Sequence, residues 1–205
     1  MRLLFALILA LASTLASAGP GREALDKFLG ELTTLEARFE QAVLDTENAR
    51  QGLFHGIFHL KRPGRFRWDY LEPEKRLIIA DGDNLWLIES DLEQITRFGQ
   101  DFALRNTPAP LFLSSDPIDE SFQVIELGER RGMQWLELLP READSDLVRI
   151  LLAFNGDSLR QLELVDTFGQ VTRFSFFEIR KNPPIEDELF TFDAPSNWDI
   201  ITENN

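Results

Sequence analysis

Two predicted strands and the turn between them lie in residues 56–70, which read GIFHLKRPGRFRWDY. Apolar and polar residues alternate on both sides of the turn Arg62-Pro63-Gly64, a pattern typical of a β-hairpin. On the second strand the aromatic residues share one face and the charged residues the other: Phe66, Trp68 and Tyr70 against Arg65, Arg67 and Asp69. The hairpin thus has one large apolar face. Alternation alone leaves open whether that face is a filled core or the wall of a ligand cavity.

The same period of two runs through most of the chain. A first strand is expected over residues 35–43, and ten further segments follow, at 51–60, 65–70, 76–80, 85–89, 94–98, 122–127, 133–139, 148–154, 159–165 and 170–179. Short turns rich in Gly, Asp, Asn and Pro connect many of them, at 62–64, 81–84, 155–157 and 166–169. Strands joined by such turns pair antiparallel, so we expect a large antiparallel sheet.

Helical periodicity occurs in two places. Apolar residues at helical spacing predict an amphipathic helix over about Glu23 to Leu32, and they are Leu25, Phe28, Leu29 and Leu32. A second, short apolar helix is expected between Leu104 and Leu113, capped by Asn106 or Thr107. A large sheet with only two or three short helices should curl, with the helices covering its concave side.

The first eighteen residues resemble a secretory signal. A positive start at Met1-Arg2 precedes an apolar run and the small-residue sequence Ala16-Ser17-Ala18. We therefore expect cleavage before Gly19 and a single mature domain over residues 19–205. Gly19 stands where a lipid-anchored envelope protein carries cysteine, so no stable membrane anchor is expected.

The composition of the chain excludes several kinds of partner and site. The formal net charge of −14 disfavours nucleic acid and anionic membrane surfaces as partners. The chain has no cysteine, which excludes disulfides and thiolate metal sites. Seventeen Phe against a single Tyr indicate a large, dry interior, because Phe adds bulk without a hydrogen-bonding group.

Residues able to carry out catalysis do not converge in the sequence. His55 and His59 lie on one predicted strand, about 13 Å apart, too far to share an ion, and we expect both to be solvated. The acidic clusters at 81–83, 91–93 and 144–146 fall in turns and do not match a calcium loop. We expect no enzymatic activity, no metal and no cofactor.

Several motifs together resemble one known family. They are the run Lys61 to Trp68, then Pro73, Asp81-Gly82, Leu85-Trp86, Leu92-Glu93-Gln94 and Thr107-Pro108-Ala109, followed by Asp166, Phe168-Gly169-Gln170, Thr172 and the closing segment Phe190 to Pro195. Their order and spacing resemble the LolA family of periplasmic outer-membrane lipoprotein carriers. The resemblance covers nearly the whole chain after residue 18.

The resemblance implies a mainly β fold with an α lid: an incomplete antiparallel half-barrel of about eleven strands, covered by about three short helices. It implies a monomeric periplasmic chaperone that holds lipoprotein acyl chains in an apolar cavity. Such a carrier takes its cargo from an inner-membrane ATP-driven exporter and delivers it to a lipid-anchored receptor at the outer membrane. A periplasmic binder or sensor of a free lipid or small hydrophobic ligand is the alternative.

Residue roles follow from the same resemblance. Arg62 matches an arginine that bonds the lid backbone and holds the empty form closed, and Phe66 matches an aromatic residue used in receiving and passing on cargo. Both also have plain structural readings, since Arg62 could solvate a hairpin end and Phe66 could fill the core. The residues expected to line the acyl-chain cavity are Phe39, Phe58, Leu60, Phe66, Trp68, Ile78, Trp86, Leu111, Phe112, Phe174 and Phe176.

Overall fold

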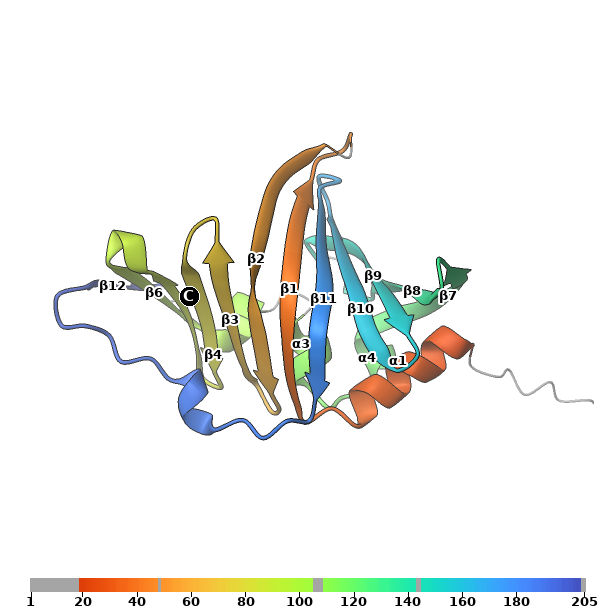
Figure 1. Ribbon diagram of the computed structural model, residues 1–205, viewed down its shortest axis with the longest axis horizontal. Helices are drawn as coiled ribbons and strands as arrows, with labels where there is room; N and C mark the ends of the chain where they lie inside the picture. Colours follow the sequence, from red (N-terminus) through yellow and green to blue (C-terminus); the bar gives the residue numbers. More distant parts are fainter. Residues whose placement is uncertain (1–18, 48, 105–108, 143–144, 204–205) are drawn as a thin grey trace, which may run out of the picture.

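The structure is a computed structural model, and it describes residues 19–47, 49–104, 109–142 and 145–203. Figure 1 shows one wide sheet that does not close on itself, with the strand order β12-β6-β5-β4-β3-β2-β1-β11-β10-β9-β8-β7. The predicted mainly β fold with an open, curled sheet is therefore confirmed.

Eleven of the strands correspond to the eleven segments of alternating sequence. Their bounds are β1 Thr34–Leu44, β2 Arg50–Lys61, β3 Arg65–Glu72, β4 Arg76–Asp81, β5 Asn84–Glu89, β6 Gln94–Gly99, β7 Phe122–Arg130, β8 Met133–Pro140, β9 Leu147–Asn155, β10 Ser158–Asp166 and β11 Val171–Lys181. All neighbours among them pair antiparallel. The first strand also pairs with the eleventh, with Phe39 opposite Phe176, and this long-range pairing joins the two halves of the sheet.

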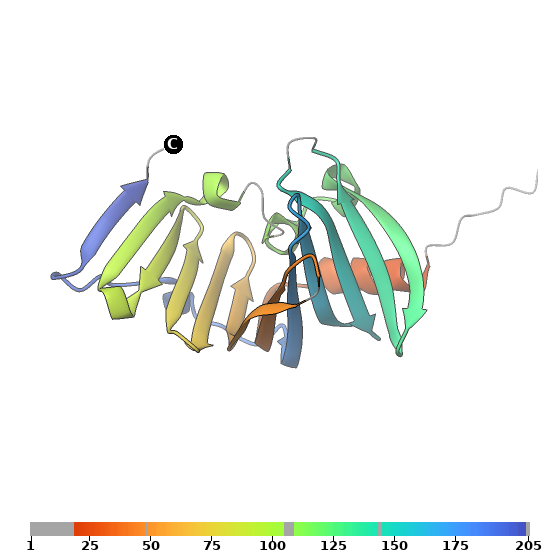
Figure 2. The same ribbon diagram turned by 90° about the horizontal axis from the view of Figure 1, so that it is seen from above.

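A twelfth strand was not predicted. β12, Asp199–Glu203, runs parallel to β6 and forms one edge of the sheet, opposite the edge made by β7 (Figure 2). After β11 the chain crosses to this edge along the outer face of the sheet, through a 3₁₀ turn at Asp187–Phe190 (Figure 1). The described sheet therefore has one parallel pair in addition to its antiparallel pairs.

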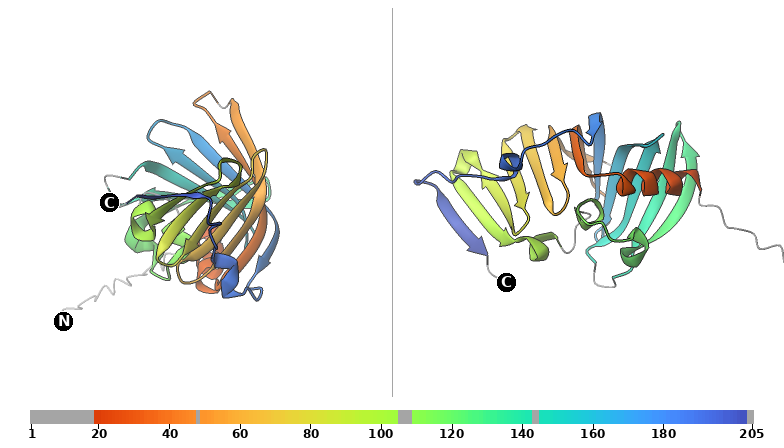
Figure 3. Two further views of the ribbon diagram at one scale, coloured as in Figure 1. Left: turned by 90° about the vertical axis from the view of Figure 1, so that its left-hand side faces the viewer. Right: turned by 90° about the horizontal axis from the view of Figure 1, so that it is seen from below.

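Helices lie across the concave side of the sheet. Their bounds are α1 Pro20–Gly30, α2 Gln100–Leu104, α3 Ala109–Leu113 and α4 Ile118–Ser121, and a 3₁₀ turn at Ser90–Leu92 precedes β6. Figure 3 shows α1 crossing β8, β9 and β10, with α3 and α4 beside it.

The helix α1 forms where the apolar spacing predicted it but ends two residues sooner. Pro20 occupies its first turn, and Leu25 and Phe28 are buried against the sheet. The helix ends at Gly30, after which Leu32 is still buried although it is no longer helical. Apolar spacing predicts which residues are buried, whereas the end of a helix depends on how its carbonyl groups are capped.

The predicted second helix is divided. α2 and α3 lie on either side of residues 105–108, and the expected cap at Asn106 or Thr107 lies outside the described residues, as does the expected signal segment at 1–18.

Two apolar clusters lie on opposite faces of the sheet. The larger joins the concave face to buried residues of α1 and to Leu104, Leu111, Leu113 and Ile118 of the short helices. The smaller lies on the outer face of β4 to β6, where Ile79, Ile88, Ile95 and Phe190 pack under the C-terminal segment. Only the larger cluster lies beneath the helices.

Candidate functional site

Most of the predicted cavity residues meet in the larger cluster. Seven of them are buried, namely Phe39, Phe58, Leu60, Phe66, Leu111, Phe174 and Phe176. Trp68, Ile78 and Phe112 are partly buried and pack against the same cluster. Strands β1, β2, β3, β4 and β11 and helix α3 thus form one continuous apolar wall.

Trp86, which was predicted to line the same wall, lies elsewhere. Its side chain packs in the smaller cluster, and its indole Nε1 donates to the Asp81 carboxylate at 2.7 Å. Trp86 pairs across β4 and β5 with Ile79, which faces outward, whereas Ile78 faces the concave side. Trp86 therefore lies on the opposite face of the sheet from the cavity residues.

Aromatic rings meet at the centre of the apolar wall. The ring of Trp68 lies 4.5 Å from Phe58, 5.1 Å from Phe39 and 5.0 Å from Phe174, measured between centroids. The predicted alternation on β3 is confirmed, since Phe66, Trp68 and Tyr70 all face this cluster. The three partner rings come from different strands, so the wall depends on the β1–β11 and β2–β3 pairings.

Two polar groups are embedded in this wall. The Tyr70 hydroxyl donates to Oε1 of Gln41 at 2.7 Å, and burial raises the pKa of Tyr70 to about 12. The indole Nε1 of Trp68 is buried and has no hydrogen-bond partner among the described residues. Burial of a donor without a partner costs free energy, and here the Trp68 ring is surrounded by the rings of Phe39, Phe58 and Phe174.

Arg62 joins the hairpin to two helices at the edge of the wall. Its Nε donates to the Phe112 carbonyl in α3 at 2.7 Å, and its Nη1 donates to the Leu29 carbonyl in α1 at 2.7 Å. Both acceptors lie in the last turn of their helix, where carbonyl groups lack partners within the helix. Partial burial of the guanidinium lowers its pKa. One side chain therefore holds both helices against the sheet.

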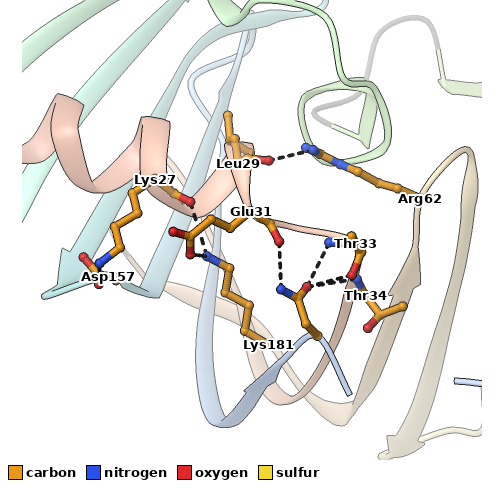
Figure 4. A network of polar contacts seen from close by, with 9 residues as sticks. Lys27, Leu29, Glu31, Thr33, Thr34, Arg62, Asp157 and Lys181 are labelled. Atoms are coloured by element: carbon orange, nitrogen blue, oxygen red, sulfur yellow. Dashed lines mark hydrogen bonds and ion pairs between the residues drawn. The ribbon is translucent and has the colours of Figure 1, made fainter. Parts of the chain in front are cut away.

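Other side chains hold the C-terminal end of α1 (Figure 4). Lys181 donates to the Lys27 carbonyl and pairs with the Glu31 carboxylate at 2.9 Å. Asn182, which has φ of 59°, donates to the Glu31 carbonyl at 2.8 Å and accepts from the Thr33 amide at 2.9 Å. These contacts fix α1 to β11.

The outer side of the hairpin binds the C-terminal segment. Lys61 donates to the Ile185 carbonyl at 2.6 Å, and Arg67 donates to the Leu189 carbonyl at 3.2 Å. Hydrogen bonds from Lys61 and then Arg65 hold the pKa of Asp187 below its usual value. The hairpin thus contacts the helices on one face and the C-terminal segment on the other.

Both histidines lie beside carboxylates of β1, on the neighbouring strand. His55 lies 3.3 Å from the Glu40 carboxylate and His59 lies 3.7 Å from that of Glu36. The expectation that both are solvated is wrong for His59, whose side chain is only 15% exposed and whose pKa is lowered by burial. In the described ranges no group of three or more His, Cys, Asp or Glu could hold a metal ion.

A pocket of about 1080 Å³ opens between α1, the β2–β3 turn and the α3–α4 segment. Its apolar lining includes Leu29, Leu32, Leu111, Ile118 and Phe122, which all belong to or pack against the larger cluster. Its polar lining includes Arg22, Arg62, Asp119, Arg141 and several serines. The pocket therefore connects the apolar interior with solvent.

Comparison with known sequences identifies the protein family of this chain. Residues 30–193 match the family described as outer membrane lipoprotein carrier protein LolA. The chain belongs to the LolA family. An outer-membrane lipoprotein carrier protein of Nitrosospira multiformis is 36% identical over 200 residues, covering 97% of this chain and 96% of its relative. A carrier of the same name from Dechloromonas aromatica is 33% identical over 202 residues, covering 98% and 97%.

A solved structure is similar to this LolA-family chain in fold. An uncharacterized conserved protein from Thermus thermophilus covers 88% of this chain and 96% of its own, with a TM-score of 0.56 and 12% identity. Within the described part of the chain, no helix is long and apolar enough to cross a membrane.

Sequence reasoning missed part of the site in this LolA-family member. Leu25 and Phe28 of α1, and Leu136, Leu138, Ile150 and Leu152 of β8 and β9, also line the larger cluster. Their periodicity was visible, but nothing local indicated that these segments share a face with β1 to β4. Arg22 and Asp119, which both line the pocket, are 97 residues apart in the sequence, and no local pattern indicated that they meet.

Proposed function

We propose that this chain is a periplasmic chaperone that shields lipoprotein acyl chains within the larger apolar cluster. It receives lipoproteins from an inner-membrane ATP-driven exporter and delivers them to a lipid-anchored receptor at the outer membrane. In this proposal residues 1–18 are removed, residues 19–205 act as one monomeric half-barrel domain without a cofactor, and no bond in the cargo is made or broken.

The observation that carries the proposal is the position of Arg62 in a LolA-family chain. Arg62 bonds both covering helices at the rim of an apolar wall that runs across five strands. A wall of this kind suits acyl chains, whose transfer out of water is worth about 0.8 kcal/mol per methylene. A chain of roughly fifteen methylenes then gains about 12 kcal/mol, so a lipoprotein cannot cross an aqueous space without such a carrier.

Release must also be possible without ATP, which sets an upper limit on the affinity of the carrier. The bonds from Arg62 to Leu29 and Phe112 offer a means of tuning that affinity. They must break when cargo separates the two helices and can reform when cargo leaves, so closure offsets part of the free energy of binding.

The experiment is a release assay. Purified mature protein is added to spheroplasts of its own host, and the soluble fraction is examined for newly made lipoproteins bound to it. A one-to-one soluble complex is the expected result. Absence of release, together with a free lipid bound to the purified protein, would favour the binder or sensor of small hydrophobic ligands instead.

A further inference from the structure

Among the described residues, two polar ties join helix α1 to the α3–α4 segment, one near each end of α1, and both arginines that make them line the 1080 Å³ pocket. At one end Arg62 bridges the carbonyls of Leu29 and Phe112. At the other end Arg22 in the first turn of α1 contacts Asp119 of α4 through two hydrogen bonds, Nη1 to Oδ1 at 2.8 Å and Nη2 to Oδ2 at 2.6 Å. Arg22 and Leu29 are seven residues apart, which on a helix is a separation of about 10 Å.

The slot framed by these two ties has a polar rim and an apolar floor. Of the lining residues, Ser115 and Asp116 are exposed and Ser114 is half-buried, which places them at the rim. Leu111 and Ile118 are buried and Leu29 is half-buried, which places them at the floor. A lipoprotein likewise has an apolar part and a polar part, because its acyl chains are apolar whereas the peptide that carries them is polar. The chemistry of the lining therefore matches the junction between the lipid and the peptide of such a cargo.

Resting on the proposed function, we propose that acyl chains enter and leave through this slot and that the Arg22–Asp119 pair is a second tie that must part during loading. The peptide of the bound lipoprotein then leaves over the rim near Ser115. Arg22 and Asp119 are positioning residues in this scheme, since they set the width of the slot and do not line the apolar wall.

The strength of the second tie suits a passage that opens repeatedly. The Arg22 side chain is 24% exposed and that of Asp119 is 53% exposed. A partly exposed pair of this kind is screened by salt, and Arg22 also pairs with Asp26, so it keeps a carboxylate partner when the tie parts. Helix α1 is held to the sheet at both ends. At its start the Arg22 amide donates to the Glu126 carboxylate of β7, and at its end Lys181 and Asn182 hold it to β11. α4 is in turn held at the end of β8, where Arg141 donates to the Asp119 and Ser121 carbonyls. The parts expected to move away from a fixed α1 are therefore α3 and the Asp119 side chain.

The absence of cysteine permits a direct test by cross-linking. R22C/D119C is bridged across the slot with a short bismaleimide. The matched control is K27C/D157C, which ties the same helix to the β9–β10 turn at the position of an existing ion pair. The probe is a synthetic diacyl lipopeptide with a fluorophore on its peptide, and its uptake rate is measured before and after cross-linking.

The proposal predicts that bridging 22 to 119 slows uptake at least tenfold, whereas bridging 27 to 157 leaves uptake unchanged. Normal uptake by the bridged R22C/D119C protein would overturn the proposal. Equal loss in both bridged proteins would also overturn it, because loading would then require α1 to leave the sheet. Failure of the unmodified protein to bind the lipopeptide would instead contradict the proposed function.

A second variant avoids the cross-link. Uptake by the natural protein should accelerate with salt, and D119N at low salt should load up to about fivefold faster, with little further effect of salt. The control E178Q weakens the exposed Arg38–Glu178 pair on the outer face and should retain the salt dependence of the natural protein. Salt acceleration that persists unchanged in D119N would contradict the role of the pair.

Discussion

Arg62 Nε lies 2.7 Å from the carbonyl oxygen of Phe112, and this contact joins the β2–β3 hairpin to a short helix 50 residues farther along the chain. The same guanidinium also reaches Leu29 in α1. Charged donors on backbone carbonyls form stronger bonds than neutral donors, yet they can be replaced by water when the helices separate.

Arg62→Leu should load lipoprotein normally but release it poorly. The substitution leaves two helix carbonyls without their donor and removes the bonds that favour the closed form, so the loaded form becomes relatively more stable. A loss of about 1.5–3 kcal/mol would slow transfer to the receptor by roughly ten- to a hundredfold. Transfer from the purified loaded carrier is the measurement, and Arg160→Leu on the exposed part of β10 is the control. Ready transfer from Arg62→Leu would sink the prediction.

Phe66→Glu should impair productive transfer. The Phe66 side chain is buried in the apolar wall, so a carboxylate there must be desolvated or protonated. The free energy of unfolding should fall by roughly 3–5 kcal/mol, and lipopeptide binding should be lost in the protein that remains folded. Phe168→Glu is the matched control, because Phe168 is 87% exposed. Equal binding by both variants, measured by titration of a fluorescent lipopeptide, would contradict the prediction.

Trp68 and Trp86 lie on opposite faces of the sheet, so substitutions at the two positions should have different effects. Trp68→Ala should weaken lipopeptide binding at least tenfold, because it removes the ring that contacts Phe39, Phe58 and Phe174. Trp86→Ala should reduce thermal stability but leave the affinity within about twofold, because Trp86 packs under the C-terminal segment. Binding isotherms at a temperature where both variants are folded test this pair. A large loss of affinity in Trp86→Ala would place that residue in the site after all.

Titration of Tyr70 provides a pH test. Tyr70 is the single tyrosine of the chain, so phenolate absorbance reports this residue alone. Its pKa in the folded protein is raised to about 12, against about 10 in the unfolded chain. A raised pKa contributes stability that is fully present below pH about 10 and is lost as the pH rises from about 10 to about 12. An absorbance midpoint near 10 in the folded protein would show that Tyr70 is not buried in the wall.

Two glycines of α1 should respond oppositely to alanine. A Cβ at Gly21 would lie 2.9 Å from Oε2 of Glu126 and 3.1 Å from Leu136, so Gly21→Ala should destabilise the protein by about 1–3 kcal/mol. A Cβ at Gly30 meets no atom within 4 Å, and Gly30→Ala should stabilise it by roughly 0.4–1 kcal/mol. Denaturant unfolding of both variants is the measurement. Equal effects would show that Gly21 does not contact β7 and β8 closely.

Part of the site could be predicted because its signal is local. Alternation in Arg65–Tyr70 assigns each side chain to a face, since successive residues of a strand point in opposite directions. Residues 85–89 were predicted as a strand of period two, but Leu85-Trp86-Leu87-Ile88 are all apolar, so the pattern does not mark which face is outer, and Trp86 was assigned to the wrong side. An all-apolar strand indicates that both faces are covered, and here the second cover is the C-terminal segment.

Contacts distant in sequence had no comparable signal. β12 has every residue exposed and pairs parallel with a strand about a hundred residues earlier, and neither feature follows from its own five residues. His59 alternates as a solvated residue would, yet it is mostly buried, because exposure depends on what packs over a strand as well as on its direction.

The sequence by itself determined the eleven antiparallel strands, the amphipathic face of α1, the position of the aromatic hairpin and, through its motifs, the LolA family. These depend on spacing along the backbone, which sets where each side chain points within its own element. Only the tertiary structure decided which faces meet. It paired β1 with β11, placed Arg62 between Leu29 and Phe112, moved Trp86 to the outer face and brought Arg22 to Asp119. Such contacts depend on the path of the whole chain, because burial and hydrogen-bond partners are shared between elements far apart in the sequence.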